Sequence, residues 1–483
     1  MRAVAEEIQD IILDIAGLAH DGRGIARLAP GNGGSDERGL TVFVQGALPG
    51  QKVRARLEQR KKSWASAVCC EVLTPAPDAV APHCPHAGQC GGCPLQTMPY
   101  ARQLAHKEDI VRQALTRIGR LAPDVVGAMC GGITPSPQLT GFRNKLTLAF
   151  GSCGTDGSPE LGLRAEGSHN VVPVPQCALV PAEGLAIAAR MQELVRAAWA
   201  NGDNRFWRFL TLRHGQTAGG EEAWWALCLT SPGSKNQRRL VRRVGEDLLA
   251  ACPQLAGFIH EERRQQDMLA VGERRVCVLG EATLHLPLGG LDFALDAASF
   301  FQVNTGAAQQ LAEHAATMLA PFAGQGHTLL DCYCGVGAPG LCLAPGFVRL
   351  RGVEAQKVSI AHATLNARNA GFSHCHYEAA DTARALASWT KDCRGDQYVA
   401  LLDPPRAGLD AATLDVLLRL RPLAVLYISC NPATLARDAA TLTKDGYRLD
   451  QLRCVDLFPH TPHVESLSLF TQDRSRFQFL ANI

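Results

Sequence analysis

The spacing of hydrophobic and polar positions divides the chain into three regions. From about residue 292 to the C-terminus, short apolar runs alternate with longer segments of mixed polarity, which predicts β-strands alternating with α-helices. Between about residues 100 and 290, runs of strand length dominate and predict a mainly antiparallel sheet. Before residue 74, β-compatible runs are separated by Gly-rich turns, a pattern typical of a small β-barrel of oligonucleotide-binding type. The pattern therefore predicts an α/β protein with three parts.

In the C-terminal region, three predicted strands end in an acid. One strand runs through Asp331 into a Gly-rich turn at residues 332–337, and Glu354 ends the next strand, nineteen positions beyond Gly335. An acid at about that spacing binds the ribose hydroxyls of nucleotide-like ligands in doubly wound folds. Asp381 and Asp403 end two further strands. Because the turn lacks the Lys-Ser/Thr of phosphate-binding loops, the sequence favours an adenosine-bearing cofactor without phosphates.

A cysteine lies at the end of the next predicted strand. Cys430 follows the apolar run 423–428 and precedes a helix start at Pro432, so its thiol faces the crevice where open α/β sheets bind ligands. Glu465, further along the chain, supplies a carboxylate to the same site. A buried core thiol is the plainer interpretation, but the nearby acids favour a nucleophile. The helix start is expected to lower the pKa of the thiol.

Three more cysteines lie close together after a Pro-rich connector at residues 74–82. These are Cys84, Cys90 and Cys93. A closed site needs a fourth ligand, for which Cys177 is preferred over Cys130 and Cys153. Cysteine thiolates hold either zinc or an iron–sulfur cluster, and the spacing alone does not separate the two. His83 and His86 keep a zinc site open.

Composition narrows the class of protein. The 483 residues are 46% apolar and 19% charged, which describes a folded, soluble chain without a membrane-spanning run. The N-terminus lacks the pattern of a signal peptide, so a cytoplasmic location is expected, and eighteen cysteines then indicate metal or catalytic thiols. The net charge of +2 does not by itself predict a polyanion partner.

A basic edge in the first region is the stronger sign of a nucleic-acid partner. It comprises Lys52, Arg54, Arg56, Arg60, Lys61 and Lys62. Trp64 follows this edge, and positive charge beside an aromatic ring suits phosphate neutralisation with base stacking. A solvated, charged strand face is the alternative interpretation.

Together these segments resemble the RNA uracil-5-methyltransferase family, which makes 5-methyluridine in ribosomal and transfer RNA with S-adenosylmethionine. The resemblance covers nearly the whole chain. It implies an RNA-binding, OB-like TRAM β-barrel at residues 1–74, a central iron–sulfur and RNA-binding domain at 75–290, and a Rossmann-like class I methyltransferase domain at 291–483.

The resemblance also implies the site residues. Cys430 matches the nucleophile and Glu465 the general base. The matched cofactor-binding positions are Gln302, Tyr333, Glu354, Asp381 and Asp403. The implied ligands of a [4Fe-4S] cluster are Cys84, Cys90, Cys93 and Cys177. One position departs from the family: Ala338 stands where asparagine or glycine is usual, and alanine has no side-chain donor for the cofactor.

The implied activity is methylation of carbon 5 of a uridine in 23S ribosomal RNA by a monomer. The cluster motif and the TRAM-like region favour the ribosomal branch over an enzyme of the transfer-RNA T-loop. A paired pyrimidine hides its carbon 6, so the target is expected in a loop or flipped out of a helix. A non-catalytic RNA-binding or assembly protein is the alternative of another class. Cytosine-5 methyltransferases place their nucleophile and base in different motifs.

Overall fold

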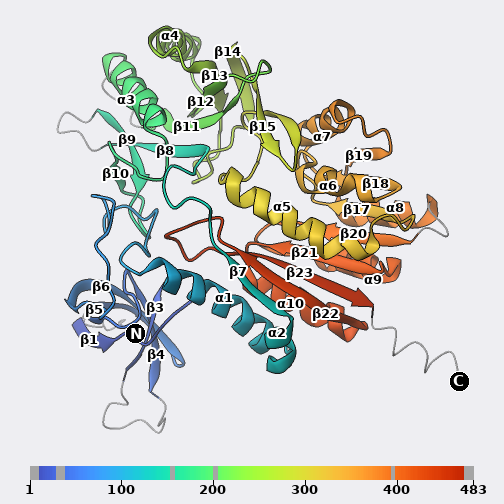
Figure 1. Cartoon of the computed structure of the whole chain (residues 1–483). Coiled ribbons are helices and arrows are strands. Elements are labelled where there is room, and N and C mark those ends of the chain that lie inside the picture. The colour runs from blue at the N-terminus through green and yellow to red at the C-terminus, as the bar shows by residue number, and fades with distance from the viewer. Residues whose placement is uncertain (1–9, 29–38, 153–157, 200–204, 393–396, 473–483) are drawn as a thin grey trace, which may run out of the picture.

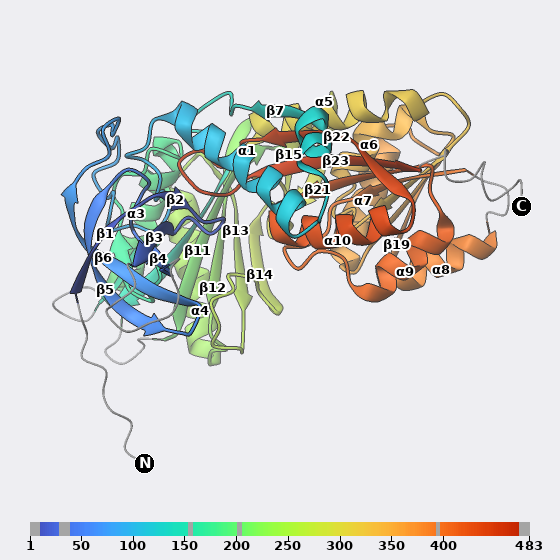
Figure 2. The same cartoon turned by 90° about the horizontal axis from the view of Figure 1, so that it is seen from below.

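The computed structural model describes residues 10–28, 39–152, 158–199, 205–392 and 397–472. Within these ranges the chain forms three sheets that follow one another in sequence, except that the strand at residues 130–134 joins the third sheet (Figure 1). The first sheet lies at one end of the molecule and the third at the other, as the turned view in Figure 2 also shows. None of the described helices is long and apolar enough to cross a membrane.

The first sheet has six described strands in the order β1-β5-β6-β4-β3-β2. Their bounds are β1 Asp10–Asp14, β2 Gly17–Leu18, β3 Gly24–Leu28, β4 Leu40–Gln45, β5 Lys52–Arg60 and β6 Trp64–Thr74. Alternate positions of β5 are buried and exposed, as expected for a strand with one face on a core. Leu13, Val42, Val44 and Val53 form that core. The basic side chains of β5 therefore lie on the outer face.

The second sheet contains nine described strands and is antiparallel except where β12 pairs with β13. Its strands are β8 Lys145–Ser152, β9 Pro159–Arg164, β10 Val171–Pro173, β11 Trp207–Gln216, β12 Glu222–Thr230, β13 Leu255–Glu262, β14 Arg274–Gly280, β15 Thr283–Leu288 and β16 Leu291–Asp296. Helices α3 (Ala182–Ala197) and α4 (Lys235–Ala251) pack on this sheet. The mainly antiparallel pairing predicted for this region is confirmed.

The third sheet has the described strand order β19-β18-β17-β20-β21-β23-β22-β7. Its strands are β7 Cys130–Thr134, β17 Thr328–Cys332, β18 Arg349–Glu354, β19 Cys375–Ala379, β20 Tyr398–Leu402, β21 Ala424–Ser429, β22 Tyr447–Val455 and β23 Glu465–Gln472. Strands β19 to β21 are parallel, whereas β23 runs antiparallel to both neighbours. Buried apolar side chains along the central strands suit a sheet that is covered on both faces.

Helices cover both faces of the third sheet, giving the layered α/β arrangement that the sequence predicts for this region. The helices are α5 Thr305–Leu319, α6 Ala338–Leu343, α7 Lys357–Asn369, α8 Thr382–Asp392, α9 Ala411–Leu420 and α10 Pro432–Lys444. In Figure 2, α5, α6 and α7 lie on one side of the sheet and α8, α9 and α10 on the other. Two separate apolar cores, one on each face, hold these layers.

One part of the chain packs differently from its place in the sequence. Helix α1 (Tyr100–Arg117), α2 (Pro123–Met129) and β7 precede the central sheet, yet α1 packs on α10, and β7 pairs with β22. Val111 and Leu115 of α1 belong to the same core as Leu435 of α10. The helix predicted near residues 101–118 is confirmed, but its apolar stripe is buried against the C-terminal layers. The domain boundaries stay a prediction.

Candidate active site

The carboxyl end of β21 holds Cys430 on a short, rigid link. Asn431 is the N-cap of α10, and its side chain accepts a hydrogen bond from the Ala433 amide at 3.1 Å. The Asn431 side chain also donates to the Arg406 carbonyl at 2.9 Å. The Cys430 thiol is half-buried at this edge of the sheet. Backbone and side-chain bonds on both sides of the cysteine thus fix its position.

Glu465 begins β23 and lies beside Cys430 because of the register between two strands. Ser466 pairs with Ser429, so Glu465 is opposite the residue that follows β21. The Glu465 side chain is buried, and its charge contributes to the pKa of Cys430. Asp403 and Arg406, from the loop after β20, act on the pKa of both groups. The structure therefore brings together three side chains that the sequence analysis named, Cys430, Glu465 and Asp403, and adds Arg406.

Burial controls the protonation of this group. Desolvation raises the pKa of Cys430 to about 11, with a further rise from the Glu465 carboxylate, while Arg406 opposes it. Desolvation also raises the pKa of Glu465 well above its usual range, and that of Asp403 to about 7. This net direction is opposite to the lowered pKa that a nucleophilic thiol needs, because burial and the Glu465 carboxylate outweigh the effect of Arg406.

A cavity lies between α5 and the Gly-rich turn at residues 332–337, at the same edge of the third sheet as Cys430. This edge is called here the catalytic edge. Gln302, Tyr333 and Asp403 line it together with the backbone of Gly335. Gly335 has a φ of +54°, and a Cβ added there would meet nothing within 4 Å, so the backbone lies open to the cavity. Burial alone raises the pKa of Asp403, a carboxylate without a compensating charge, which suits a positively charged ligand.

Two predicted cofactor residues lie at strand ends without lining this cavity. Glu354 ends β18 and accepts a hydrogen bond from the Gln356 amide at 3.0 Å. Asp381 follows β19 and accepts one from the Arg384 amide at 3.0 Å. Both acids belong to the same edge as Asp403, because their strands are parallel neighbours. In the ligand-free structure each one also caps the turn that follows it.

Several residues that line the cavity next to Asp403 were not identified from the sequence. Phe300 is 70% exposed and lies at the cavity, as do Leu311 and Ala312 of α5. Such residues resemble ordinary core or helix positions in a sequence, so only the unusual exposure of an aromatic ring identifies Phe300. Ala338, which departs from the family, also lines the cavity at the start of α6.

The four predicted ligand cysteines line a second cavity, of about 320 Å³, beside the central sheet. They are Cys84, Cys90, Cys93 and Cys177. Of the two rejected alternatives, Cys130 lies on β7, where its thiol donates to Glu108 at 3.4 Å, and Cys153 lies outside the described residues. Burial raises the pKa of Cys93 to about 12, and the three other thiols of the cavity raise it further.

Comparison with known proteins identifies the family. Residues 284–473 match the family described as tRNA (Uracil-5-)-methyltransferase. An uncharacterized RNA methyltransferase of Nitratidesulfovibrio vulgaris is 38% identical over 472 residues, which cover 96% of this chain and 95% of the relative. The chain belongs to the RNA uracil-5-methyltransferase family. These enzymes transfer the methyl group of S-adenosylmethionine.

Two further matches describe where this methyltransferase stands among its relatives. The 23S rRNA (uracil(1939)-C(5))-methyltransferase RlmD of Alkalilimnicola ehrlichii is 33% identical over 470 residues, covering 95% of this chain and 96% of the relative. The solved structure of Pyrococcus abyssi tRNA (uracil-54, C5)-methyltransferase with S-adenosyl-L-homocysteine matches with a TM-score of 0.69 at 24% identity, covering 95% of this chain and all of that one. The second likeness supports the fold alone.

The cysteine cavity of this methyltransferase offers four thiols and one buried cation to a ligand. Among the described residues, no group of three or more His, Cys, Asp or Glu side chains stands in the geometry that holds a single metal ion. A cluster would bind each thiolate to a different iron atom. Arg143 lines the same cavity, and its buried Nε has no hydrogen-bond partner. A negatively charged cluster would compensate this cation.

Proposed function

We propose that this methyltransferase forms 5-methyluridine in 23S ribosomal RNA, with Cys430 as nucleophile and Glu465 as general base. One observation carries the proposal: the register of β21 and β23 sets the thiol beside the carboxylate, next to a cavity that Asp403 shares. Gln302, Tyr333 and Asp403 would bind S-adenosylmethionine from the walls of that cavity. Glu354 and Asp381 would contribute from the ends of the neighbouring strands.

The chemistry requires a nucleophile, because carbon 5 of uracil is too electron-poor to accept a methyl cation equivalent unaided. The Cys430 sulfur adds to carbon 6, and the electron pair of the double bond moves so that carbon 5 becomes nucleophilic. When bound in the cavity that Asp403 lines, S-adenosylmethionine would supply the electrophilic methyl group, which carbon 5 takes as the bond from methyl to the sulfonium sulfur breaks and S-adenosylhomocysteine leaves. Glu465 then removes the carbon-5 proton, and the bond from carbon 6 to sulfur breaks as the double bond re-forms.

Cys430 and Glu465 must each lose a proton before they can act as nucleophile and base. Burial favours the protonated form of both Cys430 and Glu465, since it raises the pKa of each group. Arg406 favours the ionised form of both, and so does any positive charge brought to the cavity. Reactivity is therefore expected only in the complex with both substrates.

Mutation of the two residues tests their roles. Cys430→Ala should abolish methyl incorporation while RNA binding, measured by filter retention, stays unchanged. Glu465→Gln should slow turnover by about 10²- to 10⁴-fold, as expected for loss of a general base. It should also trap the RNA in a covalent adduct that is visible as a slow band on a denaturing gel. Full turnover in either variant would reject the corresponding role.

The choice of ribosomal RNA is supported by the full-length similarity to RlmD and by the four cysteines that line one cavity. A transfer-RNA T-loop uridine is the second candidate, since the family match carries that description. A non-catalytic RNA-binding or assembly role is a third, which the methyl-incorporation assay excludes if it detects activity. Mapping of 5-methyluridine in cells that lack this protein should show one site missing from 23S ribosomal RNA and none from transfer RNA.

The protein would act as a cytoplasmic monomer, and its two regions outside the methyltransferase domain would bind RNA. We propose that residues 1–74 act as a TRAM-type RNA-binding barrel, residues 75–290 as a central iron–sulfur and RNA-binding domain, and residues 291–483 as the methyltransferase domain. Exposed Lys and Arg side chains on β5 support the first assignment. The four cysteines would hold a [4Fe-4S] cluster, and purified protein should then be brown and contain iron and acid-labile sulfide in equal amounts.

A further inference from the structure

The loop that leads to Glu465 is buried, which is unusual for a connection between two strands. Between β22 and β23, residues 456–464 are buried except for Phe458 and His463, which are half-buried. Loops normally run over the surface, because water satisfies their backbone polar groups. This segment, called here the catalytic loop, forms some hydrogen bonds within itself, such as the Thr461 amide to the Phe458 carbonyl at 3.2 Å, and obtains others from distant elements.

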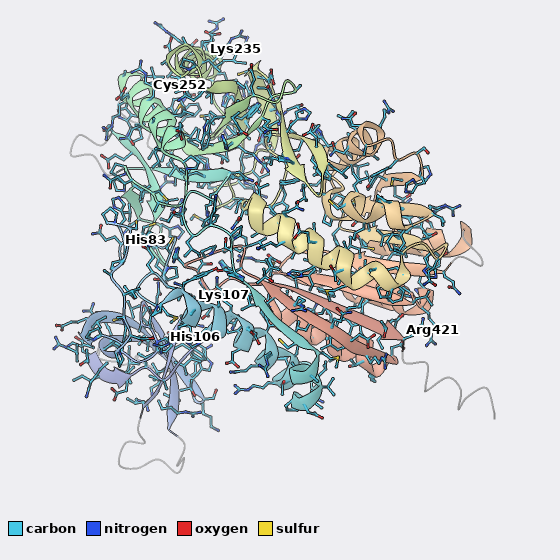
Figure 3. All side chains as sticks on the ribbon, viewed as in Figure 1. His83, His106, Lys107, Lys235, Cys252 and Arg421 are labelled. Carbon is cyan, nitrogen blue, oxygen red and sulfur yellow. The ribbon has the colours of Figure 1, made fainter. Side chains whose placement is uncertain are left out.

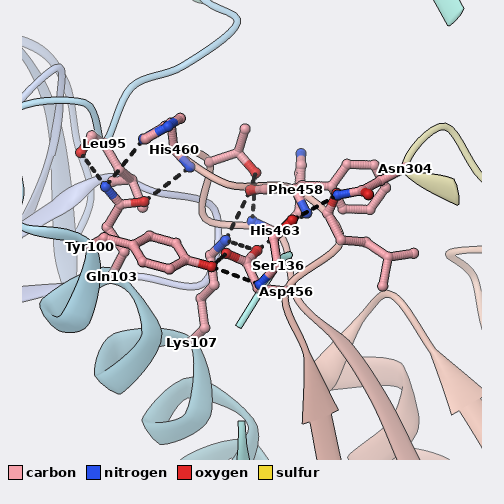
Figure 4. A network of polar contacts seen from close by, with 12 residues as sticks. Leu95, Tyr100, Gln103, Lys107, Ser136, Asn304, Asp456, Phe458, His460 and His463 are labelled. Carbon is pink, nitrogen blue, oxygen red and sulfur yellow. Dashed lines mark hydrogen bonds and ion pairs between the residues drawn. The ribbon is translucent and has the colours of Figure 1, made fainter. Parts of the chain in front are cut away.

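Those bonds come from parts of the chain far away in sequence (Figure 4). Lys107 of α1 lies 2.5 Å from the Asp456 carboxylate and donates to the Phe458 carbonyl at 2.9 Å. Gln103 of α1 accepts from the His460 amide at 2.9 Å. On the other side, Asn304 donates to the Leu457 carbonyl at 3.1 Å. Side chains from distant elements therefore add to the bonds within the catalytic loop in fixing its shape.

The segment from His83 to Leu95, which contains three of the predicted ligand cysteines, contacts the centre of the catalytic loop at His460. The Leu95 amide donates to the His460 carbonyl at 2.9 Å, and the rings of His83 and His460 lie 4.6 Å apart. His460 has a φ of +67°, a conformation that is costly for a residue with a side chain and persists only when its surroundings impose it. Figure 3 shows His83 and Lys107 on the side of the molecule where the three sheets approach one another.

The N-terminal barrel reaches the same loop through one tight turn. In the turn 19–23, the Gly22 amide donates to the Ala19 carbonyl at 3.0 Å, and Arg23 pairs with Asp21 at 2.7 Å. Gly22 is buried, with a φ of +90°, and a Cβ added there would lie 2.8 Å from Cγ of Pro462. Two carbon atoms at that distance overlap, so the turn fits against the catalytic loop only because residue 22 is glycine.

The turn is also joined to the basic edge of the barrel. The Arg23 guanidinium lies 4.8 Å from the centre of the Phe43 ring, and the Phe43 and Trp64 rings are 6.2 Å apart. The Lys61 ammonium lies 4.9 Å from the centre of the Trp64 ring. A row of contacting side chains thus connects the surface expected to bind RNA with the turn that touches Pro462.

We propose that the turn 19–23 is a positioning element for catalysis: through Gly22 against Pro462, the barrel sets where Glu465 stands. The proposal rests on the proposed role of Glu465 as the base. Pro462 is three residues from Glu465, and a displacement of about 1 Å at a reacting group costs on the order of 10²-fold in rate. The barrel then contributes to proton removal as well as to RNA affinity.

The direct test compares two glycine substitutions in the same barrel. Gly22→Ala should push Pro462 away, lower kcat about tenfold or more and increase the amount of trapped RNA adduct. The Kd for ribosomal RNA and the KM for S-adenosylmethionine should stay within twofold of the parent. Gly46→Ala is the matched control, because Gly46 has a φ of +75° but an added Cβ would meet only Cys69 at 3.7 Å. Equal kcat losses in both variants would overturn the proposal, and so would weaker RNA binding at unchanged kcat.

A second substitution tests whether the contact itself matters. Pro462→Ala removes the atom closest to the new methyl group, so the double variant with Gly22→Ala should regain at least threefold in kcat over Gly22→Ala alone. No recovery would contradict a role for this contact. Should Gly22→Ala fail to fold, Pro462→Ala alone carries the test, with reduced kcat at unchanged RNA affinity as the expected result. Unchanged kcat in that variant would overturn the proposal.

Ribosomal RNA transcribed with 5-fluorouridine separates this proposal from the proposed function. Fluorine at carbon 5 cannot be removed by a base, so adduct formation on this RNA reports only the steps before proton removal. Gly22→Ala should form the adduct at the parent rate, and a slowed rate would contradict an effect on Glu465. If Glu465→Gln keeps full turnover, the proposed base fails. If Glu465→Gln is inactive while Gly22→Ala matches its control, only the positioning role fails.

Discussion

Two thiol sites in this protein each place a half-buried cysteine near one arginine, and their other neighbours differ. At the catalytic edge, burial and the carboxylates of Glu465 and Asp403 raise the pKa of Cys430, while Arg406 lowers it. In the cysteine cavity, burial and three other thiols raise the pKa of Cys93, while Arg143 lowers it. A thiol among carboxylates has a proton acceptor at hand and suits covalent chemistry. Thiols among thiols repel one another when ionised, unless a cation joins them.

The largest expected effect comes from exchanging sulfur for oxygen at each site in turn. Cys430→Ser should lower methyl transfer to background, yet keep the iron content and the absorbance of the protein, because the alcohol is a far weaker nucleophile than a thiolate. Cys93→Ser should lose iron and absorbance and melt at a lower temperature, since metal binding stabilises the folded state. Loss of iron from Cys430→Ser, or full iron content in Cys93→Ser, would contradict the assignment of one site to covalent catalysis and the other to metal binding.

The next largest effect is expected from breaking the buried ion pair between Lys107 and Asp456, which joins α1 to the catalytic loop. Lys107 and Asp456 are both buried, and desolvation lowers the pKa of Lys107 while the Asp456 carboxylate raises it. Lys107→Met would leave Asp456 buried without its partner, which costs about 3–5 kcal/mol of unfolding free energy. Arg112→Met on the same helix is the control, because Arg112 pairs with Glu108 at 3.5 Å on the surface and such pairs contribute about 1 kcal/mol or less. Urea unfolding measures both, and equal midpoints would show that the buried pair does not hold the catalytic loop.

The residue types at both thiol sites were predictable from local sequence, because strand ends and clustered cysteines leave local signals. The parallel strands that lead to Glu354, Asp381 and Asp403 follow from apolar runs and turn residues alone. The choice of Cys177 as the fourth cysteine agrees with the cavity that all four line. These features depend on residues that are near one another in the chain or that share one edge of a sheet.

What the sequence could not predict depends on contacts between distant segments. The pairing of β7 with β22, the salt bridge from Lys107 to Asp456 and the fit of Gly22 against Pro462 each join residues more than three hundred positions apart. The raised pKa of Cys430 could not be predicted for the same reason. Its main cause is burial beneath elements that the local sequence does not show, whereas the helix start next to it is visible in the sequence.

A moderate effect is expected from removing the arginine of the catalytic edge. Since the pKa of Cys430 is about 11, the thiolate fraction, and with it kcat/KM, should rise about tenfold per pH unit from about pH 7 to 10. Arg406→Met removes a charge that lowers the pKa of both Cys430 and Glu465, so the profile should move to higher pH. One pKa unit would lower kcat/KM at pH 7 about tenfold.

The control for this variant is an exposed arginine on α9. Arg419→Met removes only a surface pair with Asp415 at 3.0 Å and should leave the pH profile unchanged. A parent profile that is flat or falls between pH 7 and 10 would contradict a thiol nucleophile with a raised pKa. It would then be necessary to assign the ionisation to the complex with RNA.

The smallest effect is expected from the arginine of the cysteine cavity. Arg143→Met removes a buried positive charge next to the proposed cluster, so the reduced and more negative form should become harder to reach and the midpoint potential should fall. A redox titration followed by electron paramagnetic resonance measures the shift, with Arg190→Met on the exposed face of α3 as control. The pH profile of kcat/KM should stay at the parent position, because Arg143 is absent from the groups that shift the pKa of Cys430 or Glu465. If Arg143→Met moves the pH profile of kcat/KM and leaves the midpoint potential unchanged, Arg143 acts on catalysis. Arg143 and Arg406 would then not have separate roles at the two thiol sites.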